Sequence, residues 1–309
     1  MTHLFIGLGP AGEAILDALL NYRAVKRARP MVLTADPENE KDDRTAETIK
    51  TLKGIDFALI FSGLGESDLT PRIAGLLTEL NIPIFLVGVV PAKRREKSEK
   101  LTAAYRSLER LEKHVRTVLI VDDERIAHLP NYEDFYPGYN RYIASCIADL
   151  LVVGAAAPGS ASASEGIAAL HMSEVFKLLS FDDEPGYVAL SRASELTKGL
   201  WGYIFPFLRH KPLDLRTLLR VSLEKFSVSD MPLGCEKCLS ILQVPDYYIN
   251  SRSVDREQVE EVLHTHAKEY RLAVFPAKRN IASITNLFTF KFDQLERLRE
   301  IRRLAHETV

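Results

Sequence analysis

Five short apolar runs, each separated from the next by a helical pattern, constrain the fold of this chain more than any other feature. They lie at residues 4–6, 30–33, 57–61, 84–90 and 118–121. The run at 84–90, IFLVGVV, does not alternate between apolar and polar residues, which is typical of a strand buried on both faces. Strands that alternate with helices in this way predict an α/β fold with a doubly wound, Rossmann-like parallel sheet.

The second half follows a different pattern. Residues 139–153 have helical spacing with apolar side chains on most faces, which indicates a long, buried central helix. An Ala/Ser-rich stretch at 155–164 is typical of a flexible loop. Beyond it, successive strand patterns surround one or two helices, which favours a smaller α+β domain with a mixed sheet. The expected divisions are a parallel-sheet domain (1–138), a central helix (139–155), a second domain (156–290) and a C-terminal helix (291–309).

We expect the central helix to lie between the two domains, without the second half extending the first sheet.

The composition also excludes several classes of protein. The 309 residues carry 40 Lys and Arg against 42 Asp and Glu, so a basic nucleic-acid coat is excluded and no nucleic-acid partner is expected. No apolar run reaches the ~18–20 residues of a membrane span, and the amino-terminal sequence does not resemble a signal peptide.

Cysteine content and one aromatic segment bear on location. Three cysteines cannot build a disulfide framework, which favours a cytoplasmic protein. Cys235 and Cys238 form one CxxC pair, but a structural zinc site needs four ligands and the chain has no second pair. Membrane association is expected only through a partner or a surface patch such as the aromatic-rich residues 201–208.

A glycine-rich turn, GLGPAGE, follows the first strand. Glycines between a strand and a helix direct backbone N–H groups and the helix N-terminus at a phosphate. Asp36 ends the second strand, where a dinucleotide fold places its ribose-binding acid. The candidate nucleotide-binding residues here are Gly7, Gly9, Pro10, Ala11, Gly12, Glu13 and Asp36.

A second glycine turn follows the third strand and adds Ser62, Gly63, Leu64 and Gly65 as candidate phosphate ligands. Two such turns at one edge are expected where several loops hold one nucleotide. Carboxylates follow at once in Glu66 and Asp68, and these repel phosphate unless a cation intervenes. The alternative interpretation is a surface turn in which an aspartate caps the next helix.

The order of these segments resembles the tubulin/FtsZ superfamily over most of the chain, with a longer insertion around residues 196–233. Residues 53–62 look like the strand that leads into the family's glycine-rich signature loop. Residues 105–126 look like the charged helix and strand that follow, and residues 189–195 like the strand after the catalytic loop. The resemblance implies GTP or GDP as ligand, with Mg²⁺ possible, and self-association or a related partner.

The same resemblance assigns the guanine base to three residues. Asp123 falls where the family has a guanine-binding asparagine, and Tyr136 and Asn140 fit the tubulin pattern Tyr-x-x-x-Asn, in which the ring stacks on the base. A carboxylate or amide oxygen can accept hydrogen bonds from guanine N–H groups. The alternative is that Tyr136 and Asn140 are ordinary residues of a helix start.

The sequence departs from the family in the signature and catalytic loops. The signature loop is shortened by about three residues, and Glu13 stands where FtsZ commonly has asparagine. Alignment of the catalytic loop puts Ala169 and His171 at its asparagine and first aspartate, and Glu174 at its second aspartate. His171 and Glu174 are therefore the candidate catalytic residues, and weak or absent GTP hydrolysis is expected.

Two other functions remain open. The turn at 7–13 with Asp36 is also compatible with an oxidoreductase that uses NAD or FAD. The acidic, shortened second loop is compatible with a scaffold that has lost nucleotide binding. A basic cluster consists of Lys93, Arg94, Arg95, Lys97 and Lys100. Two interpretations of it are open: a contact with a phosphate or an acidic partner, or the solvated start of a helix.

Overall fold

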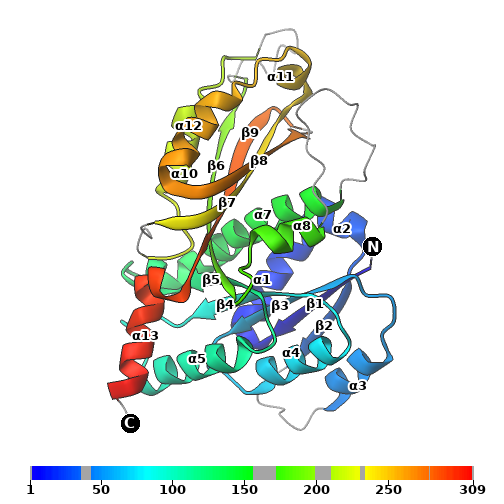
Figure 1. Ribbon diagram of the computed structural model, residues 1–309, viewed down its shortest axis with the longest axis vertical. Coiled ribbons are helices and arrows are strands. Elements are labelled where there is room, and N and C mark those ends of the chain that lie inside the picture. The colour runs from blue at the N-terminus through cyan, green and yellow to red at the C-terminus, as the bar shows by residue number, and fades with distance from the viewer. Residues whose placement is uncertain are drawn as a thin grey trace.

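A computed structural model describes residues 2–35, 43–155, 172–198, 210–229, 234–277 and 279–307. Its first half is a parallel sheet in the order β2-β1-β3-β4-β5 (Figure 1). The strands are β1 (His3–Leu8), β2 (Met31–Ala35), β3 (Phe57–Gly63), β4 (Ile84–Val90) and β5 (Thr117–Asp122). Four of these strands, β1, β3, β4 and β5, are buried along their whole length, as their continuous apolar runs predict, whereas β2 at the edge is largely exposed. The predicted α/β class is confirmed.

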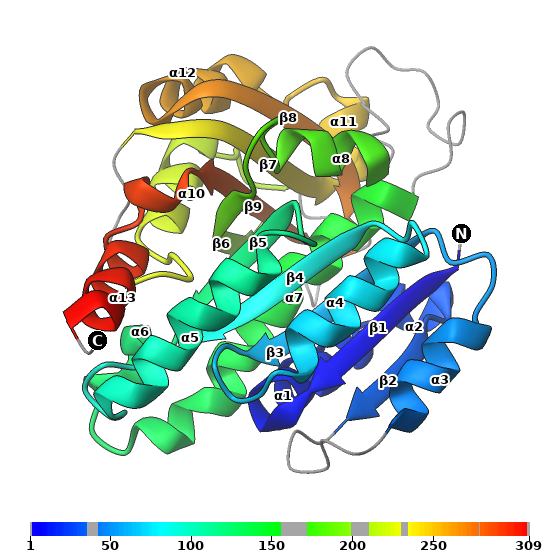
Figure 2. The same ribbon diagram turned by 60° about the horizontal axis from the view of Figure 1, so that its bottom comes forward.

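Helices cover both faces of this parallel sheet, which makes it doubly wound. In Figure 2, α4 and α5 lie in front of the strands, whereas α1 and α7 lie behind them. One face carries α1 (Gly9–Leu20), α2 (Arg23–Ala28), α7 (Tyr136–Ala155) and α8 (Met172–Leu178). The other carries α3 (Asp43–Thr51), α4 (Leu69–Glu79) and α5 (Ser98–Leu111). Two short helices, α6 (Glu124–Ala127) and η2 (Tyr132–Phe135), connect β5 to α7.

The second half contributes four strands, β6 (Gly186–Leu196), β7 (Cys235–Pro245), β8 (Ala267–Ala277) and β9 (Ile281–Phe290). β9 pairs antiparallel with β6 and β7, and β7 pairs parallel with β8, so the predicted mixed arrangement is confirmed. The helices here are α10 (Leu215–Leu223), α11 (Asp246–Asn250), α12 (Arg256–His266), η3 (Phe292–Gln294) and α13 (Glu296–Glu307). α13 packs beside α5 of the first half (Figure 1).

The expectation that the second half would not extend the first sheet is wrong. β5 and β6 pair in parallel over three residues, from Thr117 with Gly186 to Leu119 with Val188, so all nine strands share one hydrogen-bonded sheet. Farther along, the two strands part and Ser227 lies between them. Its N–H donates to Leu190 O at 2.8 Å, and its carbonyl accepts from Asp122 N at 2.9 Å. Apolar patterns predict strands, but they do not predict which strands become neighbours.

The central helix α7 connects the two halves. It begins at Tyr136, three residues before the expected start, and contacts α1 and α2 on one side and β6 and β7 on the other. In its second half, the buried Asp149 accepts hydrogen bonds from Arg192 Nε (2.9 Å), Gln243 Nε2 (3.1 Å) and Thr285 Oγ1 (2.7 Å). One carboxylate therefore holds β6, β7 and β9 against the helix.

The structure bears on some of the remaining expectations but not on others. The Ala/Ser-rich residues from 156 on and the aromatic-rich residues 201–208 lie outside the described residues. Within the described part of the chain, no helix is long and apolar enough to cross a membrane. Cys235 and Cys238 are both buried, and burial raises the pKa of each thiol, that of Cys235 to about 12. This disfavours the thiolate that metal binding or redox chemistry requires.

Asp149→Ala should destabilise the protein by about 2–4 kcal/mol, because it leaves the Arg192 guanidinium largely buried without its carboxylate. Urea unfolding provides the measurement. The control is Asp17→Ala, an exposed helical aspartate on α1, for which a change below about 0.5 kcal/mol is expected. A loss below about 1 kcal/mol for Asp149→Ala would show that the carboxylate does not hold the two halves together.

Candidate functional site

The first glycine turn has the geometry of a close backbone approach. Gly9 has a φ of 69°, in the left-handed region that favours glycine. A Cβ at Gly12 would collide with the carbonyl of Phe61 on β3, so only glycine lets α1 pack this close to the sheet. A Cβ at Gly7 would come close to Glu13 and Leu16 of α1. The N-terminus of α1, with Pro10 and Ala11 in its first turn, thus lies at the carboxyl end of β1, whereas Asp36 lies outside the described residues.

The second glycine turn is largely occupied by contacts within the protein. Leu64 is buried, and its N–H donates to Val89 O at 2.9 Å. Gly65, at a φ of 79°, lies against the backbone of Ala103 and Ala104 in α5. The Ser62 hydroxyl bonds to Thr70 Oγ1 at 2.6 Å. These contacts engage the Leu64 N–H and the Ser62 hydroxyl, two groups that could otherwise bind a ligand.

A carboxylate lies over the same turn. The Glu66 carboxyl group occupies the space that a Cβ of Gly63 would fill. The backbone N–H of Glu66 donates to Gly63 O at 3.5 Å. Partial burial raises the pKa of Glu66, while Lys100 lowers it. Asp68 occupies the N-cap position of α4, but among the described residues its side chain makes no capping hydrogen bond and pairs with Arg110 of α5. The expected side-chain cap is therefore not formed.

The three expected base-binding residues come from neighbouring elements. Tyr136, the first residue of α7, donates its hydroxyl to Asp123 Oδ2 at 3.1 Å. Asn140 is half-buried one turn later, on the same side of the helix. The ring of Tyr132 meets Tyr136 edge to face at 5.9 Å, and the Arg95 guanidinium lies 4.2 Å above Tyr132. The structure therefore forms a corner with an aromatic ring and a carboxylate in contact.

Electrostatics connect this corner to the second glycine turn. Burial raises the pKa of Asp123 to about 7; the Tyr136 hydrogen bond and Lys100 oppose the rise, and the charges of Asp122 and Glu66 add to it. Burial also raises the pKa of Tyr136. Lys100 forms a 2.7 Å ion pair with Glu96. The sequence places Lys100 in a basic cluster, but it does not show that Lys100 acts on Asp123 and Glu66. The i,i+4 spacing of Glu96 and Lys100 is compatible with an ion pair, but it does not show which part of the molecule the start of α5 faces.

Glu174, one of the two candidate catalytic residues, lies away from this corner. Glu174 is exposed on α8, and Phe176 of the same helix contacts Phe57 and Phe85 at the amino-terminal ends of β3 and β4. Asp123 follows the carboxyl end of β5, so the length of the sheet separates Glu174 from it. His171 and Ala169 lie outside the described residues. Glu174 thus cannot act on the corner of its own chain.

No protein-family model matches this sequence, and a search of curated proteins finds no match. Solved structures do match. CetZ1 from Haloferax volcanii, a GDP-bound monomer, has a TM-score of 0.74 at 17% identity, covering 100% of this chain and 99% of that chain. CetZ2 from the same organism, a GTPγS-bound protofilament, gives 0.72 at 17%, with the same coverage. An FtsZ dimer from M. jannaschii gives 0.62 at 13%, covering 94% and 88%. The chain has the tubulin/FtsZ fold.

Asp123→Asn should stabilise the protein by about 1–3 kcal/mol at pH 8. The folded-state pKa of Asp123, about 7, lies above its ordinary value of 3.8, so the native state holds a proton that the unfolded chain releases between these values. Wild-type stability therefore falls as the pH rises from about 4 to about 7, and the asparagine variant escapes that loss. Urea unfolding from pH 4 to pH 8 measures the difference, and a difference that is independent of pH would contradict it.

Proposed function

We propose that this protein binds a guanine nucleotide at the carboxyl ends of β1, β3 and β5 and acts as a tubulin/FtsZ-like assembly protein with little or no GTP hydrolysis. The observation that carries the proposal is the corner formed by Asp123, which follows β5, and by Tyr136 and Asn140, which lie one turn apart on α7. An ionised Asp123 can accept hydrogen bonds from guanine N1–H and N2–H, which adenine does not offer. Similar folds include a GDP-bound and a GTPγS-bound protein.

The residues around the phosphate position fit a nucleotide in part. The Gly9 turn and the α1 N-terminus supply backbone N–H groups beside β1, as phosphate sites at helix starts do. Glu66 opposes a phosphate, because its carboxylate covers Gly63. Binding would then require Glu66 to move, to be protonated or to share a cation such as Mg²⁺ with the phosphates. When bound, Mg²⁺ would neutralise phosphate charge next to this carboxylate.

A second candidate function follows from the same carboxylate. Because Glu66 and the internal contacts of Leu64 fill the second turn, the chain could serve as a scaffold of this fold without a nucleotide. By contrast, the strand order disfavours the oxidoreductase alternative, because β2-β1-β3-β4-β5 differs from the six-stranded order of dinucleotide-binding folds.

Calorimetry with GDP, GTP, ATP and NAD on nucleotide-free protein separates these functions. We expect the guanine nucleotides to bind best, and Asn140→Ala to weaken them about tenfold while leaving ATP unchanged. Glu66→Gln should strengthen GDP binding about tenfold, because one opposing charge is removed; Glu79→Gln, exposed on α4, is the matched control and should have no effect. Absence of binding in both wild type and Glu66→Gln would favour the scaffold, and NAD binding alone would refute the proposal.

Self-association is part of the proposal. The base corner and Glu174 lie at opposite ends of the strands, so a head-to-tail contact would bring Glu174 of one copy near the corner of the next. Such contacts form open filaments when they do not close. Similar folds include a CetZ2 protofilament and an FtsZ dimer.

Phosphate release from GTP should stay near background and should not rise with protein concentration. Of the three acid and amide positions in the catalytic loop pattern, only Glu174 remains acidic, and loss of a positioned base typically costs about 10²–10⁴-fold in rate. The measurement is a phosphate-release assay over a wide range of protein concentrations. A specific rate that climbs steeply with concentration would show that copies complete each other's sites, and Glu174→Gln would then test whether this acid suffices.

A further inference from the structure

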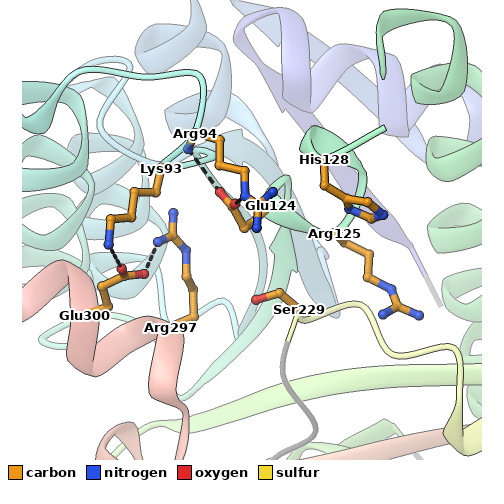
Figure 3. A pocket seen from close by; sticks show the side chains of 8 residues that line it. All are labelled: Lys93, Arg94, Glu124, Arg125, His128, Ser229, Arg297 and Glu300. Atoms are coloured by element: carbon orange, nitrogen blue, oxygen red, sulfur yellow. Dashed lines mark hydrogen bonds and ion pairs between the residues drawn. The ribbon is translucent and has the colours of Figure 1, made fainter. Parts of the chain in front are cut away.

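A pocket of about 640 Å³ lies between the two halves of the chain, on the side of β5 that faces α13 (Figure 3). It is lined by the β4–α5 connection, by α6, by α13 and by the end of the segment that lies between β5 and β6. Its volume is within the ordinary range for small-molecule sites. The lining side chains are Lys93, Arg94, Glu124, Arg125, His128, Ser229, Arg297 and Glu300.

Positive charge exceeds negative charge in this lining. Four cations face two carboxylates, both of which are already engaged. Glu300 pairs with Lys93 and Arg297 together, and Glu124 pairs with Arg94 at 2.6 Å (Figure 3). Arg125 donates to a backbone carbonyl, Glu224 O, at 2.7 Å. Behind the lining, Asp122 Oδ1 lies 3.4 Å from Arg297 Nε. Four cations therefore meet three carboxylates in all, and one positive charge stays uncompensated.

Arg297 is held rigidly at the base of this arrangement. Its side chain is only 4% exposed, and Nη2 donates to Pro91 O at 2.5 Å. Its Nε lies 3.4 Å from Asp122 Oδ1, but has no hydrogen-bond partner among the described residues. A buried, fixed guanidinium loses little conformational freedom when an anion binds beside it.

The pocket is separate from the proposed nucleotide site. Asp122 and Asp123 are consecutive, yet their side chains point to different surroundings. Asp122 accepts from Ser229 N and Oγ, at 3.2 and 2.6 Å, and faces Arg297. Asp123 accepts from Tyr136. The end of β5 therefore divides the two sites.

We propose that this pocket binds a small organic polyanion, a phosphate monoester or a polycarboxylate, between α6, the β4–α5 connection and α13. Arginine forks recognise both groups by paired, charge-assisted hydrogen bonds. The ligand would link Lys93 and Arg94 of the first half to α13 of the second. The site does not depend on nucleotide binding.

Calorimetry of the full chain with citrate and, separately, with glycerol 3-phosphate tests the proposal and distinguishes the two anion types. We expect at least one probe to bind one to one with a dissociation constant below about 1 mM, and more weakly as salt rises. The double variant Lys93→Gln/Arg94→Gln should weaken that binding at least tenfold.

The matched control is Arg216→Gln/Arg303→Gln, which removes two exposed, carboxylate-paired arginines outside the pocket and should change the constant less than twofold. Circular dichroism of each variant checks that it is folded, and His128→Gln provides a second pocket variant that breaks no described ion pair. The proposal is overturned if neither probe binds at several millimolar, or if the pocket and control variants weaken binding equally.

Discussion

The contact of Asp149 with three strands is the interaction on which the arrangement of this molecule depends. The carboxylate lies in the second half of α7 and accepts hydrogen bonds from side chains of β6, β7 and β9. The same helix begins with Tyr136 and carries Asn140 one turn later. Because a helix is rigid over this length, its position sets both where the second half lies and how the base corner faces the sheet. A buried carboxylate in this setting is stable only while its donors remain in place.

Groups that attract an anion and groups that repel it lie together at the carboxyl edge of the parallel sheet. The glycines at 9 and 12 bring backbone N–H groups close to the end of β1, which suits an anion. Glu66 and Asp123 place carboxylates at the same edge, and burial raises the pKa of both. Lys100 is the cation that acts on both of these acids, and it already pairs with Glu96. The local charge therefore favours one of two states. Either a nucleotide binds together with a cation, or the corner binds no nucleotide.

The end of β5 is the point at which the two halves meet chemically. Asp122 faces Ser229 and Arg297, both from the second half, whereas Asp123 faces Tyr136 at the start of α7. Ser227 fills the space that opens where β5 and β6 part. As a result, a displacement of α13 or of residues 227–229 would act on Asp122, which is next to Asp123, the proposed guanine-binding residue.

The amino-acid sequence was enough to predict the local elements. The five parallel strands, of which all but β2 are buried, the two glycine turns and the long apolar helix follow from periodicity and from the conformational freedom of glycine. The likeness of segment order to the tubulin/FtsZ fold also came from sequence, and it paired Asp123 with Tyr136. Three contacts were visible only in the folded molecule: β6 joins β5, Glu66 covers Gly63, and Arg297 reaches Pro91, 206 residues away. Such contacts depend on which segments pack side by side, and local patterns of hydrophobicity carry no record of the partner.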